Sequence, residues 1–71
     1  MVYMGTLAGG STSPGTFTPA AGRGDTYKVS TAGYINKVKC EVGDMFICLA
    51  DSTATATSAT CDTVQTKWSV I

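Results

Sequence analysis

The sequence predicts a small all-β domain that spans residues 1–71, a five-stranded meander of barrel-like or sandwich form with two long loops. Three observations predict this fold. The 71 residues include 12 Thr, 6 Ser, 8 Gly and 8 Ala, a mixture that forms strands and turns more readily than long helices. Short segments alternate apolar and polar residues, which is the period of a strand. Two segments rich in small residues, 9–24 and 51–62, separate these strands and are predicted as loops.

The first half of the chain predicts two strands and a tight turn. Residues 2–8, VYMGTLA, predict an edge strand with a glycine at its middle. Residues 25–30, DTYKVS, predict a second strand that places Tyr27 and Val29 on one face. The Asn36-Lys37 pair then predicts a hairpin turn, because asparagine tolerates left-handed backbone geometry.

The segment VKCEVGDMFICLA carries the clearest strand pattern in the chain. Gly43-Asp44 at its centre predicts a two-residue hairpin turn that pairs residues 38–42 with residues 45–49. In that register one face of the hairpin is wholly apolar. The other face carries Phe46 and Cys48 beside charged residues, so it is neither plain core nor plain solvent surface.

The last nine residues, TVQTKWSVI, predict a closing strand over residues 63–71. The low-complexity loop of residues 51–62 that precedes it is expected to lie outside the core. The predicted core is therefore drawn from the strands alone: Tyr27, Val29, Val38, Cys40, Val42, Met45, Ile47, Leu49, Trp68 and Val70.

The composition excludes most chemistry. The chain has no histidine, which removes the usual general base and the usual metal ligand. Cys40, Cys48 and Cys61 are odd in number and show no CxxC spacing, which predicts free, buried thiols rather than a zinc site or a disulfide framework. We therefore expect no enzyme activity, no metal and no cofactor.

The charge pattern also argues against two classes of partner. Five acidic and five basic residues give a formal net charge of +0, which leaves no electrostatic footprint for nucleic acid. No apolar run approaches the roughly 20 residues of a membrane-spanning helix, so we expect no membrane insertion.

The thin core predicts self-association. Domains of this size usually need disulfides, metal or subunit contacts, and only the last is expected here. The sequence therefore predicts a homo-oligomer. The apolar residues outside the predicted core are the candidates for its interface: Phe46, Cys48, Ile35 and Phe17. The loop of residues 9–24 is expected to contribute to docking.

Three binding motifs remain open beside this hypothesis. Tyr3 and Tyr34, with Asn36, are candidates for binding a sugar ring. Residues 23–25 spell RGD, an integrin-recognition tripeptide, although a turn into the second strand explains the same residues. Asp51 and Asp62 flank the second loop, where they could hold a surface cation or simply be solvated.

Taken together, GDTYKVSTAG, the KCEVGDMFIC segment and the terminal KWSVI resemble a short β module of bacteriophage fibre and appendage proteins. The resemblance covers Gly24 to Ile71, and YMGTLA is similar to the strand that often precedes the module. It implies a virion structural protein, of head fibre, capsid decoration or tail fibre type. Such proteins are commonly homotrimers that dock on other virion proteins. The alternative is a host-attachment role, as a carbohydrate-binding module for a host surface glycan.

Overall fold

The computed structural model describes residues 2–71, which form six strands and one short helix. The elements in chain order are β1 (Val2–Ala8), β2 (Asp25–Thr31), β3 (Gly33–Ile35), β4 (Val38–Cys40), β5 (Met45–Cys48), α1 (Cys61–Gln65) and β6 (Trp68–Val70). The predicted all-β class is confirmed. Within the described chain, the strands form two sheets rather than a closed barrel, of four strands in the order β1-β2-β5-β6 and of two strands, β3 and β4.

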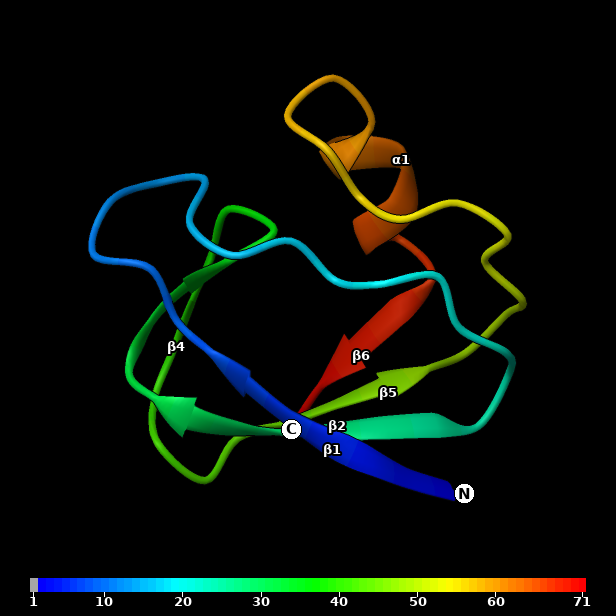
Figure 1. Cartoon of the computed structure of the whole chain (residues 1–71), viewed down its shortest axis with the longest axis horizontal. Helices are drawn as coiled ribbons and strands as arrows, with labels where there is room; N and C mark the ends of the chain where they lie inside the picture. The colour runs from blue at the N-terminus through cyan, green and yellow to red at the C-terminus, as the bar shows by residue number, and fades with distance from the viewer. Residues whose placement is uncertain (1) are drawn as a thin grey trace.

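The four-stranded sheet is not a meander, because β1 and β2 are parallel while β5 runs antiparallel to both β2 and β6. Two parallel neighbours need a crossover of a dozen or more residues to bring the chain back to the same end of the sheet. Residues 9–24 supply that crossover, which explains the length of the first loop (Figure 1). The predicted position of β1 at a sheet edge is confirmed.

The hairpin turn predicted at Asn36-Lys37 is confirmed. Asn36 has φ 51° and Lys37 has φ 69°, the two left-handed residues of a tight hairpin turn. This turn pairs β4 with β3, with Ile35 opposite Val38. The predicted pairing of residues 38–42 with 45–49 does not form, because both edges of β5 are paired, with β2 and with β6.

The prediction that Gly43-Asp44 joins the two strands of a hairpin was therefore wrong. The Asp44 N–H donates to the Glu41 carbonyl at 3.1 Å, and the Asp44 carboxylate accepts the Glu41 N–H at 2.9 Å. These contacts close a turn that ends β4 and redirects the chain. The next strand, β5, leaves β4 and pairs with β2 instead, with Phe46 opposite Tyr27.

This change of partner reverses the predicted inner face of β5. Phe46 and Cys48 are buried in the core, whereas Val42 and Leu49, which were expected there, are 65% and 55% exposed. Of the other expected core residues, Val29, Cys40 and Trp68 are buried, Tyr27, Val38, Met45 and Ile47 are half-buried, and Val70 is exposed. The buried core cluster comprises Leu7, Val29, Ile35, Cys40, Phe46, Cys48, Ala56, Val64 and Trp68.

The C-terminal segment also differs from its prediction. Only Trp68–Val70 is a strand, and Cys61–Gln65 is a helix. Cys61 and Val64 are both buried and lie three residues apart, which is helical spacing. The second loop is part of the core as well, since Ala56 is buried and its N–H donates to the Thr18 carbonyl at 2.9 Å.

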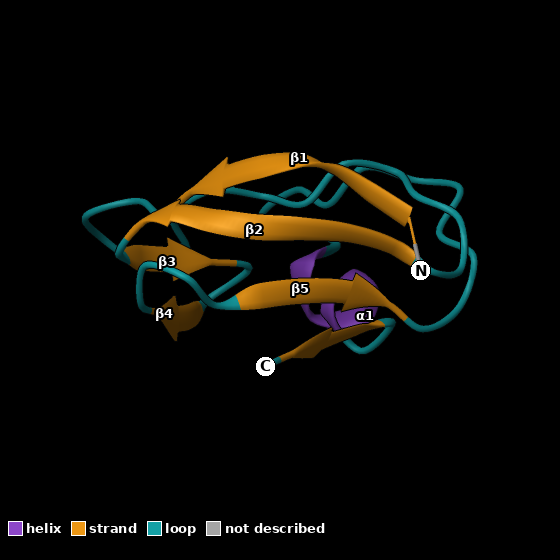
Figure 2. Cartoon of the chain, turned by 90° about the horizontal axis from the view of Figure 1, so that it is seen from below, coloured by secondary structure: helices purple, strands orange, loops and turns teal. Residues whose placement is uncertain are grey.

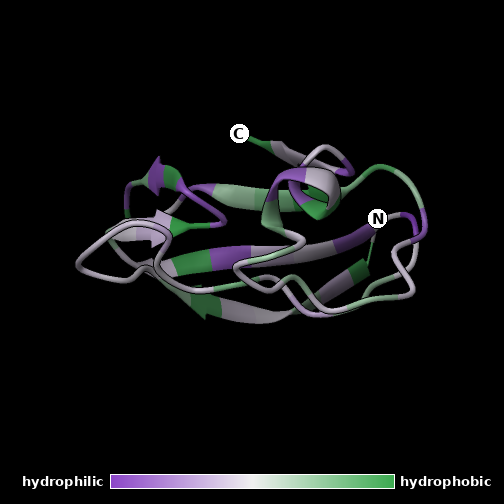
Figure 3. Ribbon diagram, turned by 90° about the horizontal axis from the view of Figure 1, so that it is seen from above, coloured by the Kyte–Doolittle hydropathy of each residue, from purple (hydrophilic) through white to green (hydrophobic). Residues whose placement is uncertain are grey.

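The elements form two layers. Loops and α1 lie across one face of the four-stranded sheet, and no other element of the described chain lies over the opposite face (Figures 1 and 2). Figure 3 views the molecule from the covered side, where the crossing loops are mostly pale, in keeping with their small residues of intermediate hydropathy. In this view, helix α1 lies on the viewer's side of strands β5 and β6.

Candidate interaction surface

The residues predicted for a subunit interface do not lie on the surface. Ile35, Phe46 and Cys48 are at most 1% exposed and belong to the core of the protomer itself. Phe17 is half-buried and packs against the same core. The prediction is corrected for a simple reason. The strand register that placed Phe46 and Cys48 outside the core does not form, and Ile35 and Phe17 pack against the same core from β3 and the first loop.

The predicted sugar-binding set is also divided by the fold. Asn36 is fully buried, its side-chain carbonyl accepts the Thr18 N–H at 3.1 Å, and its side-chain amide donates to the Thr18 hydroxyl at 2.8 Å. Its polar atoms therefore hold the first loop and are not free for a ligand, which corrects its assignment. Tyr34 is half-buried, whereas Tyr3 is exposed.

The two tyrosines do not form a common platform. Tyr3 lies opposite Thr26, near the start of β1, while the backbone of Tyr34 pairs with Gly10, beyond the end of β1. At the rise of a strand, the intervening residues separate the two positions by about 20 Å. A single sugar ring cannot span this distance.

The RGD residues form a turn. The Asp25 carboxylate accepts the Gly22 N–H at 2.9 Å, and the Asp25 N–H donates to the Gly22 carbonyl at 3.0 Å. Gly24 has φ 92°, which only glycine adopts readily. The Arg23 N–H donates to the Asp51 carboxylate at 2.8 Å. The Asp25 carboxylate is therefore directed back into its own loop.

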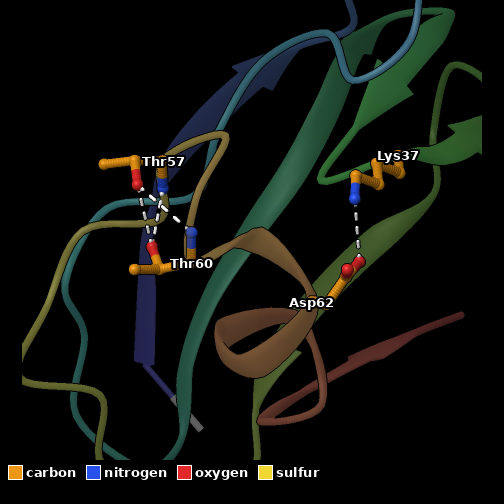
Figure 4. A network of polar contacts seen from close by, with 4 residues as sticks. All are labelled: Lys37, Thr57, Thr60 and Asp62. Atoms are coloured by element: carbon orange, nitrogen blue, oxygen red, sulfur yellow. Dashed lines mark hydrogen bonds and ion pairs between the residues drawn. The ribbon is translucent and has the colours of Figure 1, made fainter.

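Asp51 and Asp62 have separate partners. Asp51 holds the turn at Arg23, whereas Asp62, at the start of α1, forms an ion pair with Lys37 at 3.0 Å (Figure 4). The hydrogen bond to Asp62 and its charge raise the pKa of Lys37 above the ordinary value of 10.5. Residues 2–71 contain no cluster of three or more His, Cys, Asp or Glu side chains able to hold a metal ion.

Two threonines order the chain just before α1 (Figure 4). The Thr57 N–H donates to the Thr60 hydroxyl at 3.0 Å, and the Thr60 N–H donates to the Thr57 hydroxyl at 3.3 Å. The Lys37–Asp62 pair then joins the start of the helix to the β3–β4 turn. Together these contacts fix the second loop on the covered face of the sheet.

The three thiols are free and buried, as predicted. Burial raises the pKa of both Cys40 and Cys61 above the ordinary value of 9.0. Both thiols are therefore protonated at neutral pH, and a protonated, buried thiol is a poor nucleophile. The arrangement does not suit them for covalent chemistry.

The most distinctive surface feature is the uncovered face of the four-stranded sheet, hereafter the open face. Strand register places two complete rows of side chains on it, because residues opposite each other in a ladder share a face. The first row is Tyr3, Thr26, Ile47 and Ser69. The second is Thr6, Lys28, Met45 and Ile71, the last of which exchanges two backbone hydrogen bonds with Met45.

The open face mixes apolar with polar side chains, and one of its members, Thr26, is only 1% exposed. Tyr3 is 61% exposed and Ile71 is 71% exposed, while Met45 and Ile47 between them are half-buried. No pocket forms among residues 2–71. Sequence analysis identified Tyr3 as exposed but missed the other three, because the alternation in β5 fixes which residues share a face without saying which face is covered.

No protein-family model, no curated protein and no solved structure matches this chain. Within residues 2–71, the single helix has five residues, far too few to cross a membrane.

Proposed function

We propose that this chain is a non-enzymatic structural protein of a phage-like particle, of head fibre, capsid decoration or tail fibre type. In this proposal it acts in the virion by forming a homo-oligomer and by docking on other virion proteins. The resemblance of GDTYKVSTAG, KCEVGDMFIC and KWSVI to phage appendage modules is the support for this setting. The motifs do not indicate how the protein acts in that setting.

One structural observation supports association as the mode of action. Seven large apolar side chains are exposed, and three of them, Val2, Tyr3 and Met4, are consecutive in the edge strand β1. The full set is Val2, Tyr3, Met4, Val42, Leu49, Val70 and Ile71. Exposed large apolar side chains favour protein contacts, because their transfer out of water is favourable.

The direct test is the native mass of the protein. Light scattering after size exclusion, at micromolar concentration and under reducing conditions, is expected to give a mass of two or more chains. Particles of the encoding phage, purified through a density gradient, are expected to retain the chain at a fixed stoichiometry. A monomer that is found only in the soluble fraction of the lysate contradicts the proposal.

A carbohydrate-binding role is the second candidate, and the exposure of Tyr3 favours it. A flat aromatic face in solvent is the group that stacks on a sugar ring. A glycan array is expected to show saturable binding that Tyr3→Ala removes and that Tyr34→Ala retains, since Tyr34 lies far from Tyr3. No binding across the array, or equal loss in both variants, contradicts this role.

A further inference from the structure

We propose that the free edge of strand β1 pairs with the same edge of a second copy of this chain. The two β1 strands run antiparallel in this arrangement, and their backbone hydrogen bonds join two four-stranded sheets into one. This inference rests on the self-association in the proposed function and names the segment through which it occurs.

The outer edge of β1 is unpaired. The strand is the outermost one of the four-stranded sheet and pairs with β2 on one side only (Figure 2). Among residues 2–71, the backbone of Tyr3, Met4, Gly5 and Thr6 has no hydrogen bond outside the ladder with β2. An edge strand directs alternate backbone N–H and C=O groups away from its sheet. The group that complements such a row is another extended backbone.

The side chains near the start of β1 are uncovered on both faces of the sheet. Val2 and Tyr3 lie in regular register opposite Asp25 and Thr26, so they point to opposite faces. Both are nevertheless exposed, by 56% and 61%. Met4, which has no partner in β2, is 51% exposed. An added strand therefore contacts apolar side chains on both faces as well as the backbone between them, and both contacts favour pairing.

A second copy of β1 is the partner that this edge fits. Proteins guard a free strand edge with charged side chains, with proline or with a covering segment, and the β1 sequence VYMGTLA has neither charge nor proline. The other edge strand, β6, has three residues, whereas β1 has seven and is the longer edge that a second copy presents. Two identical antiparallel strands match the donors of one with the acceptors of the other.

The expected assembly is a pair. A twofold contact uses the same segment on both copies and closes with two chains, in contrast to the three that the resemblance to fibre modules implies. The register shift at Met4 interrupts regular pairing at that residue, so the shared ladder is short. The association is therefore expected to be reversible.

Sedimentation equilibrium of the full chain, from micromolar to millimolar concentration, measures this association. Tyr3→Lys and Met4→Lys each place a charge on the free edge, and each is expected to weaken association at least about 10-fold. Val42→Lys is the matched control, because it adds the same charge in place of a side chain that is 65% exposed, in the turn between β4 and β5. It is expected to associate as the unaltered chain does.

Hydrogen exchange distinguishes edge pairing from contact through another surface. In the unaltered chain, the amides of Tyr3–Thr6 that face away from β2 are expected to exchange at least about 10-fold more slowly at the concentration where the chain associates. Met4→Lys is expected to lack this slowing at the same concentration. Circular dichroism identifies any variant that fails to fold, in which case the exchange of the unaltered chain decides.

The outcomes separate this inference from the function on which it rests. If the unaltered chain associates while the amides of Tyr3–Thr6 exchange at an unchanged rate, edge pairing is overturned and self-association stands. Equal association of folded Met4→Lys and Val42→Lys overturns edge pairing as well. A mass of three chains overturns the twofold pair. A folded monomer at every concentration overturns both this inference and the self-association in the proposed function.

Discussion

Replacement of Asn36 is expected to remove a large part of the stability of this domain. The residue is fully buried in the β3–β4 turn and joins that turn to the first loop. Its N–H donates to the Thr16 carbonyl at 2.8 Å, and its side chain exchanges two hydrogen bonds with Thr18, which is also fully buried. A glycine or alanine at this position leaves the Thr18 N–H and hydroxyl buried without these partners.

The magnitude follows from these contacts. Each buried group left without a partner costs about 1–3 kcal/mol, so Asn36→Gly, which keeps the left-handed backbone and orphans two groups, is expected to cost about 2–6 kcal/mol. Asn36→Ala adds about 1–2 kcal/mol, because a β-carbon is disfavoured at φ 51°. A domain of 71 residues has a free energy of unfolding of only about 4–11 kcal/mol in total.

The assay is urea unfolding followed by the fluorescence of Trp68, the only tryptophan, which is buried against Tyr27 and Phe46. With a slope near 1 kcal/mol per molar urea, the midpoint of Asn36→Gly is expected to fall by about 2–6 M. Thr18→Val is the companion variant, because it removes the hydroxyl from the other side of the same pair. The double variant is expected to cost less than the two single variants added together. A midpoint within about 0.3 M of the unaltered protein for Asn36→Gly would refute the reasoning.

Three further predictions test the core, the ion pair and the thiols. Phe46→Ala is expected to destabilise the domain by about 3–5 kcal/mol in the same urea assay, because Phe46 is central to the protomer core; a small effect would return it to the surface. The Lys37–Asp62 pair raises the pKa of Lys37, so its contribution is complete below pH 10.5 and disappears as the pH rises through the higher folded-state pKa. Melting temperatures of the unaltered protein and Asp62→Asn should therefore differ at neutral pH and converge in strong alkali, and a difference that is constant with pH would contradict this. The three buried thiols are expected to react slowly with a disulfide reagent at pH 8 in the native protein and rapidly in urea; fast native reaction of Cys40 or Cys61 would show that burial does not protect it.

The parts of the fold that depend on local chemistry were predictable from the sequence. The left-handed turn at Asn36-Lys37 and the strand that begins at Asp25 each follow from a few neighbouring residues, whereas the closing strand predicted over residues 63–71 is a strand only at Trp68–Val70. The pairing of strands was not predictable in the same way. Both Asn36-Lys37 and Gly43-Asp44 have the chemistry of a hairpin turn, and only the long-range pairing of β5 with β2 and β6 decides between them.

The errors in the candidate site follow from that one choice. Once β5 pairs with β2, the side chains of β5 that face the covered side are Phe46 and Cys48, and those of the open face are Met45 and Ile47. A shift of strand partner thus exchanges core and surface for the whole strand. The candidate interface therefore excludes Phe46 and Cys48, which belong to the core.

The first loop shows why composition alone misleads about flexibility. Its glycines predict a loose segment, yet a β-carbon on Gly9 would lie 2.6 Å from the Gly33 α-carbon, and one on Gly15 would collide with the Tyr34 carbonyl. These glycines permit close backbone contact with β3, where Gly10 and Tyr34 exchange hydrogen bonds of 2.8 and 2.9 Å. The loop is therefore a packed layer of the protomer that covers one face of the sheet.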